Sequence, residues 1–221
     1  MQLYLIRHGQ SLVNVRSQLD QQPSMDAGLT EVGFKQARAL AQWLPGEVPQ
    51  IHALYTSTLL RARQTSQILA EIYGCEMRPD DRLREIGSSF LDHLPVTVES
   101  LPQNYEQYLR NYFTKSKLPY QPIAHDVERS ESYMHFRVRI GAFVDDLTRL
   151  HLEEAVLVVC HEGVINAVFD HVFNIGPYRT CHIFNENTGI THLVYSPHPE
   201  RESWGLRFQN RTEHLKGIIG E

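Results

Sequence analysis

Residues 1–14 read MQLYLIRHGQSLVN, and this stretch decides the fold of the chain. The four apolar residues 3–6 stand directly before Arg7, His8 and Gly9, a pattern typical of a strand buried on both faces of a parallel sheet. Open α/β sheets bind ligands at the carboxyl ends of their strands. Arg7 and His8 are therefore candidate functional residues, and we expect Gly9 to allow a sharp turn. The same residues could also be the polar end of an ordinary strand, so partners must come from elsewhere.

A second buried strand ends in the same kind of signal. Residues 155–159 read AVLVV, and Cys160, His161, Glu162 and Gly163 follow them. If both strands are central and parallel, His8 and His161 emerge at one edge of the sheet. A third apolar strand, residues 53–56, leads into a helix that carries Arg61. The sequence thus predicts a cationic pocket made of two histidines and two arginines.

The remaining pattern alternates strands with amphipathic helices. We predict an α/β fold, a three-layer sandwich with a mainly parallel central sheet, helices on both faces and a helical or loop lid insertion. One domain spans residues 1–221, with the lid at about residues 88–130 and a helix within it at residues 104–113. Thr30 caps a helix that ends at Pro45-Gly46, and Ser57 or Thr58 caps one that runs to Tyr73 and stops at Gly74. Further elements are expected near Ser11 (helix) and at residues 132–151 (helix), 164–173 (helix), 188–195 (strand) and 206–209 (strand).

Composition narrows the function classes. The chain has 221 residues, 42% hydrophobic and 21% charged, which is ordinary for a soluble globular protein. A net charge of -5 without a basic stretch disfavours nucleic acid as a partner, but it is compatible with a small phosphorylated substrate. Three cysteines without CxxC spacing indicate a reducing compartment, and neither a signal peptide nor a membrane-spanning run is recognised. We therefore expect a cytoplasmic protein with no membrane partner; the sequence assigns no oligomeric state.

The clustered residue types suit phosphoryl transfer. Arginine offers a fixed fork of donors to phosphate oxygens, and imidazole can attack phosphorus to form a covalent intermediate. Such a site stabilises charge through positioned donors and needs no metal. The leaving oxygen requires a proton donor, and Glu85, just before the predicted lid, is the candidate.

Three rival chemistries fail on spacing. A tyrosine-phosphatase-type thiolate needs an arginine six residues after the cysteine, but those positions hold Asn166 and Asn187. A zinc-binding HExxH helix would need a second histidine where Ile165 stands. No GxxxxGK[ST] phosphate loop occurs, and the other histidines show no tight metal-ligand spacing, so no metal site is predicted.

At this point the chain resembles the histidine phosphatase superfamily, the phosphoglycerate mutase-like proteins. Arg7-His8-Gly9-Gln10-Ser11 with Asn14 resembles the family's opening signature, although Gln10 and Ser11 replace the commoner Glu and Thr. Later blocks resemble the family in the same order: Leu29-Thr30-Glu31 with Gly33, Tyr55-Thr56-Ser57 with Arg61, Leu83-Arg84-Glu85, Glu131-Ser132 with Arg139, and His161-Glu162-Gly163. After Glu85 the chain departs from the family, and Asp92 and His93 stand where the family often has Glu and Gly.

The resemblance implies a role for each residue. His8 would be the phosphorylated nucleophile, and Glu85 the general acid and then the base. Arg7, Arg61 and His161 would bind the phosphoryl oxygens with help from Asn14, and Glu162 joins the candidate substrate-binding residues. No metal or cofactor is implied.

The resemblance leaves several activities open. The mutases of this family carry a basic insertion that contains tryptophan. The insertion in this chain has no tryptophan and only scattered basic residues, so we expect a phosphomonoesterase of the phosphatase branch. A cofactor-dependent phosphoglycerate mutase is the first alternative. A binding protein that holds a phosphorylated ligand without turnover is the second. The aromatic residues of the predicted lid suggest a ring-bearing or apolar leaving group, or they pack the lid onto the core.

Overall fold

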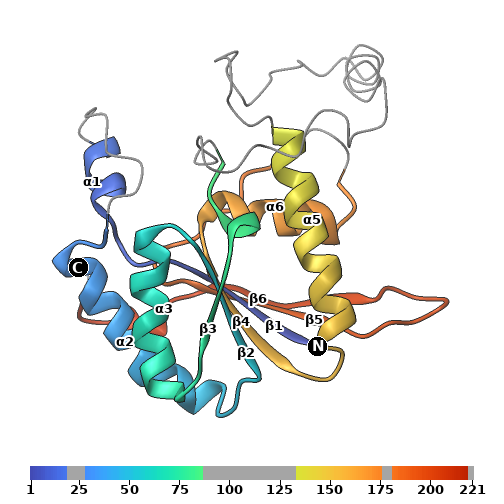
Figure 1. Cartoon of the computed structure of the whole chain (residues 1–221), viewed down its shortest axis with the longest axis horizontal. Helices are drawn as coiled ribbons and strands as arrows, with labels where there is room; N and C mark the ends of the chain where they lie inside the picture. Colours follow the sequence, from blue (N-terminus) through green and yellow to red (C-terminus); the bar gives the residue numbers. More distant parts are fainter. Residues whose placement is uncertain (19–27, 87–132, 176–180, 219–221) are drawn as a thin grey trace.

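The computed structural model describes residues 1–18, 28–86, 133–175 and 181–218, which form a six-stranded sheet covered by helices (Figure 1). The strand order is β3-β2-β4-β1-β5-β6. The four strands at the β3 side are parallel, β5 pairs antiparallel with β1, and β6 pairs antiparallel with β5. The mainly parallel α/β fold predicted from the sequence is confirmed. The strands are β1 (Gln2–Arg7), β2 (Ala53–Ser57), β3 (Met77–Asp80), β4 (Ala155–Cys160), β5 (Ile190–Tyr195) and β6 (Trp204–Arg211).

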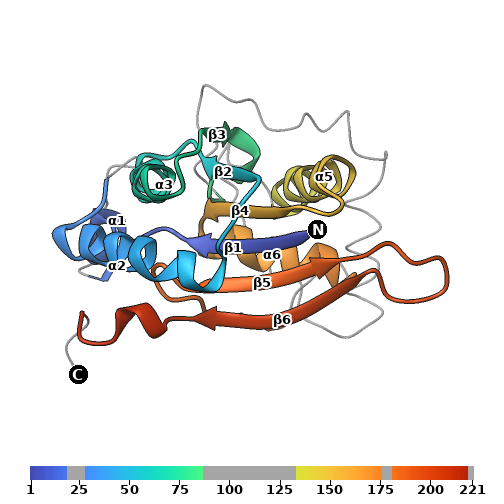
Figure 2. The same cartoon turned by 90° about the horizontal axis from the view of Figure 1, so that it is seen from below.

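Helices cover both faces of this sheet. The helices α2 and α3 lie on one face and α5 and α6 on the other, as the two perpendicular views agree (Figure 2). In the described residues the helical elements are α1 (Leu12–Gln18), α2 (Glu31–Glu47), α3 (Leu60–Tyr73), η1 (Asp81–Leu83), α5 (Tyr133–Leu150), α6 (Glu162–Val172) and η3 (Glu213–Leu215). None of these helices has both the length and the apolar character that a membrane crossing requires.

The alternation of side chains along the central strands divides the core into two layers. Leu3 and Leu5 of β1 pack with the α5 and α6 side, whereas Ile6 packs with the α2 and α3 side. In β4 the alternation runs through Val156 and Val158 on one face and Leu157 and Val159 on the other. A strand with two buried faces must be apolar at every position, which explains the continuous hydrophobic run seen in the sequence.

The predicted end of α2 is wrong. The helix continues through Pro45 and Gly46 to Glu47, and the N–H of Val48 closes its last turn on the carbonyl of Leu44 at 2.8 Å. A proline inside a helix removes the hydrogen bond that its missing N–H would donate, and its ring crowds the carbonyl four residues earlier, which is why the sequence predicted a stop here. The packing of Leu44, 1% exposed, favours continuation.

The start of α3 also differs from the prediction. Its N-cap is Leu59, which makes no side-chain cap, so neither Ser57 nor Thr58 is the capping residue. The predicted stop is confirmed, because Gly74 takes the left-handed conformation with φ of 60°. The sequence also missed β3, a short edge strand whose residues are half-buried or exposed and include Pro79. Such a strand carries neither alternation nor a continuous apolar run.

The predicted lid at about residues 88–130, its helix at residues 104–113, and the positions of Asp92 and His93 lie outside the described residues. The single-domain organisation over residues 1–221 stays a prediction.

Candidate active site

His8 and His161 face each other at the carboxyl ends of the two central strands. The strand β1 pairs with β4 in parallel register, Arg7 opposite Cys160, so the residue that follows each strand emerges at the same height. The two imidazole rings meet edge to face with their centroids 5.0 Å apart. Both side chains are buried, at 3% and 0% exposed. The juxtaposition predicted from the sequence is present.

Arg61 reaches this pair from α3. Its Nε donates a hydrogen bond to Nε2 of His8 at 3.1 Å, and its side chain is buried. Arg63, two residues along the same helix, is exposed, as the helical spacing predicts. A buried guanidinium beside an uncharged imidazole is a strong donor group for an anion, because little solvent competes for its N–H groups.

The loop after β1 is held by close backbone packing. The Gly9 N–H donates to Oγ1 of Thr65 on α3 at 3.1 Å. A Cβ on Gly9 would lie 2.6 Å from the Gly33 carbonyl oxygen, and one on Gly33 would lie 2.0 Å from the Gln10 carbonyl oxygen. Gly9 is not among the residues with positive φ. The glycine is therefore required for the close approach of α2 and not for the sharp turn that we expected.

The contacts of His8 define which ring nitrogen is free to react. Nδ1 lies 2.7 Å from the carbonyl oxygen of Gly9, and a carbonyl only accepts, so Nδ1 carries the proton. Nε2, which accepts from Arg61, then holds the lone pair. Burial, then the charge of Arg61, holds the pKa of His8 well below its usual 6.5. His8 is thus a neutral imidazole with Nε2 available as a nucleophile at neutral pH.

His161 is the N-cap residue of α6. Its Nε2 lies 2.8 Å from the hydroxyl of Ser57, and its Nδ1 is buried without a hydrogen-bond partner in the described part of the chain. Burial lowers the pKa of His161 well below 6.5, and electrostatic interactions with His8 and with the arginines Arg61, Arg139 and Arg7 lower it further. His161 therefore enters the site uncharged.

Glu85 follows η1 and lies against the start of α6. Its carboxylate accepts the N–H of Gly163 at 3.1 Å and of Ile86 at 2.9 Å. A Cβ on Gly163 would lie only 2.2 Å from the nearer carboxylate oxygen, so the glycine makes room for the acid. Burial raises the pKa of Glu85, while those two N–H groups and the arginines Arg61 and Arg7 oppose the rise. The net direction favours a carboxyl group that can carry a proton.

Arg7 is held by residues that follow β4. Its Nη1 lies 3.2 Å from a carboxylate oxygen of Glu162 and also donates to the carbonyl of Asn185. The other oxygen of Glu162 contacts Nε2 of His182 at 3.1 Å and the Asn185 N–H at 3.3 Å. Nε of Arg7 is buried and has no partner among the described residues. One edge of the guanidinium is thus fixed, and Nε is left for a ligand.

Asn14 occupies the first turn of α1. Its Oδ1 accepts from the backbone N–H of Ser11 at 3.0 Å and its own backbone N–H donates to the Ser11 hydroxyl at 3.4 Å, a reciprocal pair of the capping-box type. Asn187 links this turn to the nucleophile, since its Nδ2 donates to the His8 carbonyl at 2.9 Å and lies 3.5 Å from Oδ1 of Asn14. The acceptor of Asn14 is therefore used within the protein, and its amide nitrogen is the atom left for substrate.

The structure adds residues that the sequence interpretation did not assign to the site: Ser57, Thr65 and Asn187. Ser57 ends a strand, as Arg7 and Cys160 do, and that position was the available signal. Thr65 and Asn187 act through backbone contacts with the loop around His8, which no spacing rule reveals. In residues 1–18, 28–86, 133–175 and 181–218, no group of three or more His, Cys, Asp or Glu is arranged to hold a metal ion.

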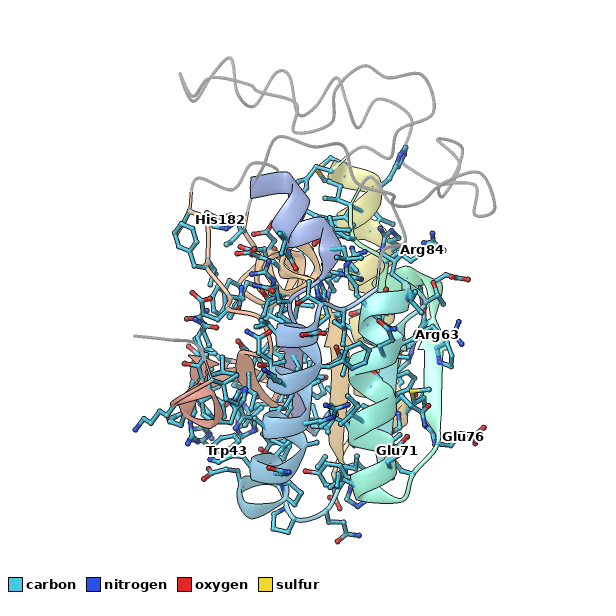
Figure 3. All side chains as sticks on the ribbon, turned by 90° about the vertical axis from the view of Figure 1, so that its left-hand side faces the viewer. Trp43, Arg63, Glu71, Glu76, Arg84 and His182 are labelled. Carbon is cyan, nitrogen blue, oxygen red and sulfur yellow. The ribbon has the colours of Figure 1, made fainter. Side chains whose placement is uncertain are left out.

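Figure 3 shows where this site lies in the molecule. Arg84, the neighbour of Glu85, and His182, the partner of Glu162, lie toward the same end, whereas Trp43 and Glu76 lie toward the other. The end that carries Arg84 and His182 is where the carboxyl ends of the parallel strands meet. It is the position at which open α/β sheets bind ligands.

Comparison with known protein families agrees with this geometry. The model of the histidine phosphatase superfamily (branch 1) matches residues 3–206. The chain belongs to this superfamily. Family membership and a relative named as a phosphatase support a phosphoryl hydrolase activity.

The relatives carry two kinds of name. A protein of Hydrogenobacter thermophilus named "Putative phosphoserine phosphatase 2" is 28% identical over 216 residues, covering 98% of each chain. A protein of Yersinia enterocolitica named "Probable phosphoglycerate mutase GpmB" is 26% identical, covering 97% of this chain and 95% of its own.

Solved structures show the same fold. A phosphoserine phosphatase variant from Entamoeba histolytica in complex with phosphoserine is 24% identical, with a TM-score of 0.66 over 97% of this chain and 98% of that one. A mycobacterial glucosyl-3-phosphoglycerate phosphatase in complex with VO3 is 25% identical, with a TM-score of 0.65 over 95% and 98% of the two chains.

Proposed function

We propose that this protein is a phosphomonoesterase that hydrolyses a small phosphorylated metabolite through a phosphohistidine intermediate on His8. The observation that carries the proposal is the hydrogen bond from Nδ1 of His8 to the Gly9 carbonyl. It fixes the proton on Nδ1 and leaves the lone pair on Nε2, at a buried position beside Arg61 and His161. A neutral nucleophile that is already oriented needs no deprotonation before it attacks.

In the first step Nε2 of His8 attacks phosphorus, and the bond between phosphorus and the ester oxygen breaks. Glu85 in its acid form gives its proton to the departing oxygen, so the leaving group departs as an alcohol. The incoming phosphoryl group takes over the N–H that Arg61 directs at His8, together with Nε of Arg7 and the free nitrogen of His161. These donors stabilise the charge on the non-bridging oxygens during transfer.

In the second step water attacks the phosphohistidine. Glu85, now a carboxylate, accepts a proton from that water, the bond between phosphorus and Nε2 breaks, and the lone pair returns to His8. Inorganic phosphate leaves, and both residues are restored to their starting protonation states. The raised pKa of Glu85 suits a group that must be an acid in one step and a base in the next.

The remaining candidates take supporting roles in this scheme. Glu162 orients Arg7 through their ion pair, and this is the way in which it contributes to substrate binding. Asn14 offers its amide nitrogen to a phosphoryl oxygen while its oxygen holds the turn of α1. The scheme uses positioned N–H groups for charge stabilisation, so we propose that the reaction is independent of metal ions. We also propose a cytoplasmic protein, which the three free cysteines support.

The insertion of this chain favours hydrolysis over phosphoglycerate mutase activity, because it lacks the tryptophan and carries only scattered basic residues. At the described site, the charge of Arg7 is also partly used within the protein, by its ion pair with Glu162. The mutase remains the alternative, since relatives bear that name. Incubation with 3-phosphoglycerate, with and without the bisphosphorylated primer, distinguishes the two: we expect free phosphate, and primer-dependent 2-phosphoglycerate would identify a mutase.

The decisive experiment compares wild type with His8→Ala on p-nitrophenyl phosphate and on a panel that starts with phosphoserine and 3-phosphoglycerate. We expect turnover that persists in a chelator and label transferred from ³²P-substrate to the wild-type protein under alkaline quench, both abolished by His8→Ala. The exposed His198→Ala is the matched control and should leave both unchanged. Full activity of His8→Ala would refute the nucleophile, and binding of phosphate monoesters without turnover by wild type would identify a binding protein.

A further inference from the structure

Ser57 occupies a buried position between two parts of the site. It is the last residue of β2, next to β4 in the sheet, and it is 0% exposed. Its Oγ lies 2.8 Å from Nε2 of His161 and 3.3 Å from the backbone nitrogen of Leu59. The sequence suggested it as a helix cap, but Leu59 is the N-cap of α3. The hydroxyl therefore needs another explanation.

The hydrogen-bonding capacity of a hydroxyl determines the direction of these contacts. Serine has one O–H donor and two acceptor lone pairs. The Leu59 N–H only donates, so Oγ accepts there and its own proton remains available for Nε2 of His161. A neutral imidazole that accepts at Nε2 must carry its proton on Nδ1. The chain from Leu59 N–H through the Ser57 O–H to His161 is then consistent at each atom.

The other nitrogen of His161 shows what this arrangement prepares. Nδ1 is buried and has no partner among the described residues, although buried polar groups in folded proteins are normally hydrogen-bonded. The ring lies edge to face against His8, the proposed nucleophile. An anion bound at His8 would supply the acceptor that an Nδ1–H lacks.

We propose that Ser57 is a positioning residue that fixes the Nδ1–H tautomer of His161 and thereby aims that N–H at the phosphoryl group. The inference rests on the proposed function, because the phosphoryl group is the partner of Nδ1. Both histidines carry the proton on Nδ1, but they present opposite atoms to the ligand. His8 turns Nδ1 to a backbone carbonyl and presents its lone pair, whereas His161 turns Nε2 to Ser57 and presents its N–H.

The direct test is the tautomer of His161, read from the ¹⁵N chemical shifts and long-range ¹H–¹⁵N couplings of the histidine rings near pH 7.5. Assignment uses the loss of one ring system in His161→Asn. We expect Nδ1 of His161 protonated in wild type and mixed tautomers in Ser57→Ala. Ser57→Thr, which keeps the hydroxyl, should restore the single tautomer. A purely structural role would lower stability without changing this signature.

Binding of inorganic phosphate supplies the second readout. Without Ser57 only part of the His161 population presents its N–H, so we expect Ser57→Ala to weaken inhibition by phosphate about tenfold, the effect of one hydrogen bond. The kcat/KM should fall by at least the same factor. Thr56→Val is the matched control, because it removes a neighbouring buried hydroxyl that donates to the Ser57 carbonyl and does not contact His161. It should change phosphate inhibition less than twofold.

Two results would overturn the inference: a wild-type spectrum with Nε2 of His161 protonated, or a Ser57→Ala protein whose tautomer and phosphate inhibition match wild type. The wild-type spectrum decides even if Ser57→Ala does not fold. Failure of the proposed function gives a different result, since wild type would then bind phosphate with the expected tautomer but release no phosphate from any monoester.

Discussion

Nε of Arg61 lies 3.1 Å from Nε2 of His8, the nitrogen that holds the lone pair. The arginine therefore directs an N–H at the atom proposed to attack phosphorus. This contact orients the imidazole. Burial lowers the pKa of His8 most, and the charge of Arg61 lowers it further, so the lone pair stays unprotonated at neutral pH. In the proposed reaction a phosphoryl oxygen replaces His8 as the acceptor of that N–H, so one guanidinium serves the resting site and the transfer.

We predict that Arg61→Lys lowers kcat/KM by about 10²–10³-fold, the usual effect of removing one donor from a charge-stabilising site. An ammonium group lacks the planar fork that can contact His8 and phosphate oxygens from one side chain. Steady-state kinetics on p-nitrophenyl phosphate measure the change, and circular dichroism checks the fold. Arg63→Lys, on the exposed side of α3, is the control and should behave as wild type. Equal activity of both variants would remove Arg61 from the mechanism.

We predict that the effect of Glu85→Gln depends on the leaving group. An alcohol needs a proton in order to depart, whereas p-nitrophenolate departs readily without one. The variant should therefore lose about 10²–10⁴-fold in kcat/KM, which reports formation of the phosphohistidine, on an alkyl phosphate such as phosphoserine and much less on p-nitrophenyl phosphate. The kcat falls on both substrates, because Glu85 also activates the water of the second step. Parallel kinetics with the two substrates measure the ratio. A uniform loss of kcat/KM on both substrates would indicate that Glu85 does not supply the leaving-group proton.

We predict that Gly163→Ala displaces Glu85. The new Cβ would lie 2.2 Å from the Glu85 carboxylate, so the acid must move while the first turn of α6 remains helical. The variant should reproduce the leaving-group dependence of Glu85→Gln, with a loss of at least about tenfold on the alkyl ester. Gly205→Ala is the control, since nothing lies within 4 Å of its Cβ. If Gly163→Ala retains wild-type kcat on both esters, the close contact does not position the acid.

We predict that stability falls on acidification below pH 6.5. The folded-state pKa values of His8 and His161 lie well below 6.5, mainly because both rings are buried. Below pH 6.5 these two histidines are therefore protonated in the unfolded chain but stay neutral in the folded chain. Each histidine adds a slope of at most about 1.4 kcal/mol per pH unit, and neither contributes above pH 6.5. Glu85 changes stability in the opposite direction: above pH 4.5 its raised pKa makes the folded state bind more protons than the unfolded state, so its contribution to stability falls as the pH rises.

Urea unfolding between pH 7.5 and pH 5 measures this slope. His161→Asn should reduce it by as much as one proton equivalent, and the exposed His198→Asn should leave it unchanged. An unchanged slope in His161→Asn would show that this ring takes up a proton in the folded state.

Much of the fold could be predicted because its central strands are buried on both faces. Residues 3–6 and 155–159 have to be apolar throughout, and that requirement is visible without a structure. The sequence correctly predicted the helix boundaries that depend on a local capping conformation, namely the N-cap at Thr30 and the left-handed C-cap at Gly74. The helix signals failed at Pro45, because the packing of Leu44 stabilises a further turn of a helix that the local sequence predicts to end. The strand signals failed at β3, because an edge strand does not require an alternating or continuous apolar pattern.

The sequence by itself determined that two histidines and two arginines follow the strands and turns of one sheet edge, since strand polarity and helical spacing are local properties. Tertiary structure alone decided which atoms these residues present. The Gly9 carbonyl accepts the proton of His8, and Arg61 donates to the nitrogen that holds the lone pair. The Glu85 carboxyl group occupies the space next to Gly163, and the Ser57 hydroxyl contacts Nε2 of His161. Hydrogen-bond direction and desolvation depend on groups far apart in the chain, so residues 1–14 contain the proposed nucleophile but do not show which of its ring nitrogens holds the lone pair.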